Sequence, residues 1–180
     1  MLTRTNKIWL GIGAVLLLLG LFDIGDGFLG NGRLGAGKFF YDKEKVASLV
    51  AGAQEPAAAF LHACDNDAVA ERFDSRSVKK LGRWCDAVQS FQEAPDEVSG
   101  VQLMRANNLY FDRITDKLFL GSGELPHLAL DLMKARADFR PPMEQVGSIR
   151  AGACFSEALI GFVLLVVGLL CLRRGRRRTT

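Results

Sequence analysis

The chain has 180 residues and a formal net charge of +3 at pH 7, and 49% of its residues are apolar. This length predicts a single domain. The apolar residues are concentrated in two blocks, which argues against an ordinary soluble protein. The densest positive charge is confined to a C-terminal tail too short to indicate a nucleic-acid-binding protein.

Two apolar blocks lie near the chain ends. Residues 8–22 and 158–172 contain no charged side chain. A core helix of a soluble protein normally carries a polar stripe, and these blocks carry none. With neighbouring residues, each block approaches the about 20 residues that cross a bilayer. We therefore predict transmembrane helices at 8–24 and 151–172.

The first apolar block also has the basic start and the length of a secretory signal peptide. A cleavage site would need small residues at the end of the block, but the chain there reads Leu21, Phe22 and Asp23. The pattern therefore favours an uncleaved signal anchor.

Lys and Arg residues near the predicted spans indicate the membrane orientation. Residues 1–7 carry Arg4 and Lys7, residues 173–180 carry five arginines and no acid, and the region between the spans is slightly acidic. Both termini are therefore predicted to be cytoplasmic in a bacterial inner membrane. The tail arginines are expected to contact anionic lipid headgroups; they are Arg173, Arg174, Arg176, Arg177 and Arg178.

A glycine-rich connector is predicted at 25–40. Its residues 32–38 match the G-x-x-x-x-G-K pattern of a nucleotide-binding loop. Such a loop needs a preceding strand and a Ser or Thr after the lysine, but a membrane helix precedes it and Phe39 follows Lys38. We predict no nucleotide binding.

Helical periodicity dominates residues 41–150. Asp42 is expected to cap a short helix, and Pro56 to open a second one. A third helix begins near Ser75 or Ser77 and ends before Pro95. A fourth runs from about Asp96 to Leu120, with Asn108 on its apolar seam, and a fifth ends at Pro141-Pro142. Strand signals are weak, so the fold class is all-α: two transmembrane helices flank an extracytoplasmic bundle of four to five helices.

Cys64 and Cys85 are predicted to form a disulfide. If residues 57–71 and 77–93 form a helical hairpin that turns near 74–75, the two cysteines lie at equal height on its apolar faces. An oxidising compartment then favours the bond. The alternative is a metal site that adds His62 and His127. His62 and Cys64 point apart on a helix, so no metal is predicted.

Glycines recur at intervals of seven in both predicted spans. Gly13 and Gly20 lie in the first, and Gly161 and Gly168 in the second, with Cys154 on the same face. Such spacing lets helix backbones approach closely, either within the chain or against a partner. Glu157 is expected near the membrane surface, within reach of water.

No catalytic motif or cofactor-binding pattern is present in the sequence. The layout resembles the sensor portion of bacterial chemoreceptors, but no motif is shared and these 180 residues hold no cytoplasmic signalling domain. We expect a non-enzymatic accessory or scaffold subunit of a bacterial inner-membrane complex, with a membrane-protein partner or a second copy of itself. The alternative is a periplasmic sensing module that signals through a membrane partner.

Overall fold

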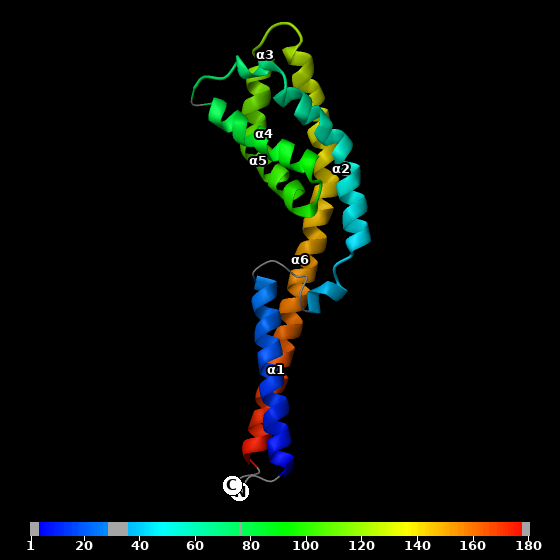
Figure 1. The fold of residues 1–180 in the computed structure, drawn as a ribbon, viewed down its shortest axis with the longest axis vertical. Coiled ribbons are helices and arrows are strands. Elements are labelled where there is room, and N and C mark those ends of the chain that lie inside the picture. The colour runs from blue at the N-terminus through cyan, green and yellow to red at the C-terminus, as the bar shows by residue number, and fades with distance from the viewer. Residues whose placement is uncertain (1–3, 29–35, 76, 178–180) are drawn as a thin grey trace. The chain divides into compact units, whose positions relative to one another are not determined.

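The computed structural model describes residues 4–28, 36–75 and 77–177, and within these ranges its regular secondary structure is entirely helical, with no strand (Figure 1). This confirms the all-α fold class. The elements in chain order are α1 (Arg4–Phe28), the 3₁₀ helix η1 (Ala36–Phe39), α2 (Lys43–Cys64), α3 (Asp67–Ala70), α4 (Val78–Glu93), α5 (Glu97–Phe119) and α6 (Leu125–Arg177).

The chain divides into two compact units. The first, here the terminal hairpin, comprises residues 1–42 and 148–180, and the second, here the helical domain, comprises 43–147. Helix α6 contributes its first part to the helical domain and its second part to the terminal hairpin.

Three prolines lie inside helices that they were expected to open or end. Pro56 is inside α2, and Pro141 and Pro142 are inside α6. A proline in a helix interior loses a hydrogen bond and clashes with the preceding turn, at a cost of about 3 kcal/mol. Here the buried face continues across each site, through Ala53 to Ala57 and through Phe139 to Met143. The expected helix boundaries at these prolines are wrong because packing on that face outweighs the local penalty.

Aromatic side chains form the centre of the helical domain. The Phe60 ring makes edge-on contacts with Trp84, Phe111 and Phe139 at centroid distances of 5.7, 6.1 and 5.8 Å. These rings come from α2, α4, α5 and α6, so one cluster joins four helices. All four side chains are almost fully buried, and such aromatic pairs add stability beyond the area they bury.

Helix α5 contributes a polar side chain, Asn107, that hydrogen-bonds to an aromatic side chain in the core. Trp84 donates its indole N–H to Oδ1 of Asn107 over 2.7 Å. Asn107 is buried, whereas Asn108, which was expected on the apolar seam, is exposed. The expected seam position was therefore wrong by one residue, because a buried tryptophan needs an acceptor at that height.

Candidate functional site

The terminal hairpin is built on a seam of glycines between α1 and the second part of α6. A Cβ on Gly20 would lie 2.6 Å from the carbonyl oxygen of Gly161, and one on Gly13 would lie 2.9 Å from that of Gly168. Real Cβ atoms do not come this close, so only glycine permits this separation of the backbones. The structure thus brings together all four glycines singled out in the sequence, in an antiparallel pair of helices (Figure 1).

The glycine seam continues one further repeat at each end. A Cβ on Gly27 would lie 2.8 Å from the carbonyl oxygen of Cys154, and one on Gly175 would lie 3.4 Å from that of Asn6. Both glycines extend the same seven-residue spacing, which returns to one helix face after two turns. Sequence reasoning missed them because it placed Gly27 in the connector and Gly175 in the tail, although the spacing was visible.

Three carboxylate side chains are buried near one end of this seam. Asp23 and Asp26 on α1 are 8% and 6% exposed, and Glu157 on α6 is fully buried. A Cβ on Gly161 would lie 2.9 Å from the Asp23 Cβ, which places Asp23 against the turn of α6 that follows Glu157. Glu157 was expected to extend toward water, but it shares a face with Gly161 and is enclosed by the hairpin. Buried carboxylates in an apolar segment are costly and mark positions of special structural or functional importance.

The opposite end of the terminal hairpin combines arginines with a tryptophan. The guanidinium carbon of Arg174 lies 4.9 Å from the centroid of the Trp9 ring, a cation–π contact between α6 and α1. Arg173, Arg174 and Arg176 are exposed. The Arg177 side chain and Arg178 lie outside the described part of the chain. Tryptophan and arginine are the residues that typically occupy the boundary between lipid and water.

The two predicted disulfide partners are joined in the helical domain. Cys64 is the last residue of α2 and Cys85 lies in α4, with their Cα atoms 5.6 Å apart. This separation is typical of a disulfide. Cys154 and Cys171 are not part of a disulfide. The bond closes a segment that includes the short helix α3, and thereby ties the end of α2 to the middle of α4.

The alternative metal site is not assembled. His62 and His127 do line one recess of about 800 Å³, but Cys64 and Cys85 are outside it and bonded to each other. Within the described residues, no group of three or more His, Cys, Asp or Glu side chains has a geometry that could hold a metal ion.

The glycine-rich connector is described only in part, because residues 29–35, which include the start of the nucleotide-loop pattern at 32–38, lie outside the described residues. The expected start of the connector at residue 25 is wrong, because α1 continues to Phe28, and the 3₁₀ helix η1 (Ala36–Phe39) lies within the expected connector. In η1 the Lys38 amine lies 5.1 Å from the centre of the Phe39 ring. A nucleotide-binding loop needs a strand before it and a helix after it, and the preceding element here is helical.

Comparisons with protein families, with curated proteins and with solved structures found no match for this chain. The class of this protein is therefore described from its fold alone. The chain is an all-helical protein with two helices, within Asn6–Phe28 and Leu125–Arg176, that are long and apolar enough to cross a membrane. Only 17% of the most apolar stretch of each is buried in the protein. This low burial distinguishes both from the core helices of a soluble protein.

Proposed function

We propose that this chain is a non-enzymatic accessory or scaffold subunit of a bacterial inner-membrane complex. In this proposal α1 and the apolar part of α6 span the membrane, both termini are cytoplasmic, and the helical domain lies in the periplasm. Two observations support this placement. Seven Lys and Arg residues flank the outer ends of the apolar segments, and the Cys64–Cys85 pair fits an oxidising compartment.

The proposed scaffold function rests on a glycine in α1, Gly11, that does not contact α6. The seam glycines contact α6, whereas a Cβ added to Gly11 would meet nothing within 4 Å. Gly11 lies between exposed side chains, since Ile8, Ile12 and Val15 are 53%, 44% and 56% exposed. A glycine among large apolar side chains forms a notch in which another membrane helix can approach closely. That helix belongs to a partner protein or to a second copy of this chain.

The scaffold proposal is tested by crosslinking in native membranes. A photo-crosslinking amino acid replaces Ile12, beside the notch, and in a matched control replaces Val163, which is 52% exposed on α6. We expect a discrete protein adduct from position 12 and only lipid adducts from position 163. Gly11→Leu fills the notch without touching the seam and is expected to abolish the adduct.

Two results would contradict the scaffold proposal: no protein adduct at position 12, or an adduct that Gly11→Leu leaves unchanged. Mass spectrometry of the adduct identifies the partner. An adduct of the chain with itself assigns the notch to a homo-oligomer, and an adduct with one other membrane protein assigns it to a complex.

The second candidate function is periplasmic sensing, which the recesses on the helical domain favour. One recess, of about 800 Å³, is lined by both histidines of the chain and by Arg72. A sensing module must be stabilised by its ligand. Thermal unfolding of the purified protein against a library of small metabolites tests this candidate, and a set of metabolites that leaves the melting temperature unchanged argues against it.

A further inference from the structure

A smaller recess in the helical domain has the composition of an anion site with an apolar floor. Its volume is about 220 Å³. It lies between the segment that joins α3 to α4, the start of α4, and the second half of α5. Its lining residues are Phe73, Ser77, Lys80, Tyr110, Arg113, Ile114, Asp116, Lys117 and Leu120.

The floor of this recess is apolar. Ile114 is 1% exposed, and Phe73 and Tyr110 are half-buried. Leu120, the residue that caps the C-terminal end of α5, lines the rim and is 81% exposed. An exposed leucine beside an apolar floor gains free energy when another apolar group covers both. The floor therefore favours the apolar part of a ligand.

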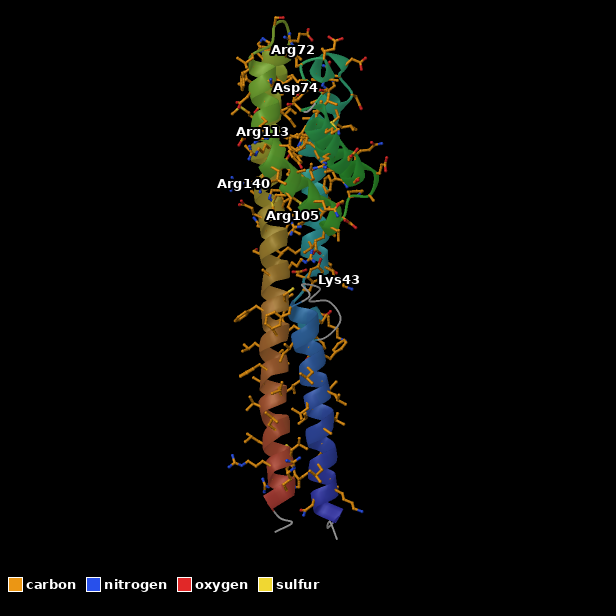
Figure 2. The ribbon with its side chains drawn as sticks, turned by 90° about the vertical axis from the view of Figure 1, so that its left-hand side faces the viewer. Lys43, Arg72, Asp74, Arg105, Arg113 and Arg140 are labelled. Atoms are coloured by element: carbon orange, nitrogen blue, oxygen red, sulfur yellow. A yellow bond between two sulfur atoms is a disulfide. The ribbon has the colours of Figure 1, made fainter. Side chains whose placement is uncertain are left out.

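The rim of the recess is positively charged. Lys80 from α4 and Arg113 and Lys117 from α5 line it, against one acid, Asp116. Among the described residues none of the three cations forms an ion pair (Arg113 extends outward from α5 in Figure 2). Arg113 and Lys117 are four residues apart on one helix, where like charges repel. One anion bound at this rim would reduce the repulsion among the three cations that line it.

We propose that this recess binds a small amphipathic carboxylate, with its carboxylate among Lys80, Arg113 and Lys117 and its apolar body against Phe73 and Ile114. Arginine suits this role because its guanidinium pairs with a carboxylate through two parallel hydrogen bonds. The small volume of the recess suits a small aromatic or short-chain acid. The site lies wholly in the helical domain, so it stands whether or not α1 binds a partner helix.

The recess is tested by equilibrium dialysis of the full chain held in amphipol, with phenylacetate as the probe. Phenylacetamide, which has the same ring without the charge, and acetate, which has the charge without the ring, are the matched ligands. We expect saturable binding of one phenylacetate with a Kd below about 1 mM, and binding of either matched ligand weaker by about tenfold or more.

Variants locate the binding in the recess. Arg113→Gln and Lys117→Gln are each expected to weaken phenylacetate binding by about tenfold, because each removes a charge-assisted hydrogen bond. Leu120→Asn removes the apolar rim at an exposed position and should weaken phenylacetate more than acetate. Lys79→Gln is the control, since Lys79 is exposed on α4 and does not line the recess. Circular dichroism confirms that each variant remains folded.

Several results would overturn the amphipathic carboxylate site. Absence of saturable phenylacetate binding excludes it. If acetate binds as tightly as phenylacetate, the apolar floor makes no contribution and only the surface cations attract the ligand. If phenylacetamide binds as tightly as phenylacetate, the negative charge of the ligand makes no contribution. A loss in Lys79→Gln as large as that in Lys117→Gln shows that general surface charge, not the recess, attracts the anion.

Discussion

The Trp84 indole N–H donates to the Asn107 side-chain oxygen across 2.7 Å in the core of the helical domain. This hydrogen bond joins α4 to α5 beside the aromatic cluster of Phe60 and Phe111. Because both partners are buried, neither can exchange the bond for water. The bond therefore selects one relative position of the two helices.

Replacing Asn107 is predicted to destabilise the helical domain. Asn107→Ala leaves the Trp84 N–H buried without an acceptor, at a cost of about 1–3 kcal/mol. Asn108→Ala is a matched control, since Asn108 is exposed, and should change stability by less than about 0.5 kcal/mol. Denaturant unfolding of the detergent-solubilised protein, followed by tryptophan fluorescence, measures both. Equal effects of the two variants would contradict the structural role of Asn107.

The Cys64–Cys85 bond is predicted to stabilise the domain and to report its compartment. Cys64→Ser should lower the free energy of unfolding by about 2–4 kcal/mol, because the open chain gains entropy when unfolded. A reductant should destabilise the native protein and leave this variant unaffected. Non-reduced protein from its native membrane should contain the linked peptide, with Cys154 and Cys171 as its two free thiols. Four free thiols in that material would refute the pairing.

Filling the glycine seam is predicted to separate α1 from α6. A Cβ at Gly20 meets the Gly161 backbone, whereas one at Gly11 meets open space. In a chain with Leu17→Cys and Leu164→Cys, and with Cys154 and Cys171 replaced by serine, oxidation should crosslink the two helices. Adding Gly20→Leu should abolish this crosslink, and adding Gly11→Leu should preserve it. Loss of the crosslink in both variants would show that the seam does not set the helix separation.

The proposed membrane orientation predicts which side of the membrane each region faces. Ser122 is exposed between α5 and α6, so Ser122→Cys should react with an impermeant maleimide in intact spheroplasts. Thr180→Cys should react only after the membrane is permeabilised. Both variants need Cys154 and Cys171 replaced by serine. The reverse labelling pattern would place the helical domain in the cytoplasm and remove the compartment argument for the disulfide.

Local sequence signals were sufficient to predict several elements of the fold. Helix α5 was expected from about Asp96 to Leu120 and runs from Glu97 to Phe119. Asp96 accepts a hydrogen bond from the Ser99 backbone N–H over 2.8 Å, and Ser99 accepts one in return, so the start is specified within four residues. The apolar segments and the seven-residue glycine spacing were equally visible, because length and periodicity are properties of contiguous sequence.

The features that depended on tertiary contacts could not be predicted in the same way. Pro56 and Pro141 are helix breakers by local rules, and their helices continue because buried residues on either side pack against other helices. The seven-residue spacing specified a face, but only the packed hairpin paired Gly20 with Gly161 and extended the seam to Gly27. Helix periodicity depends on residues that are close together in the sequence. The pairing of two faces, and the recesses between them, depend on side chains far apart in the chain.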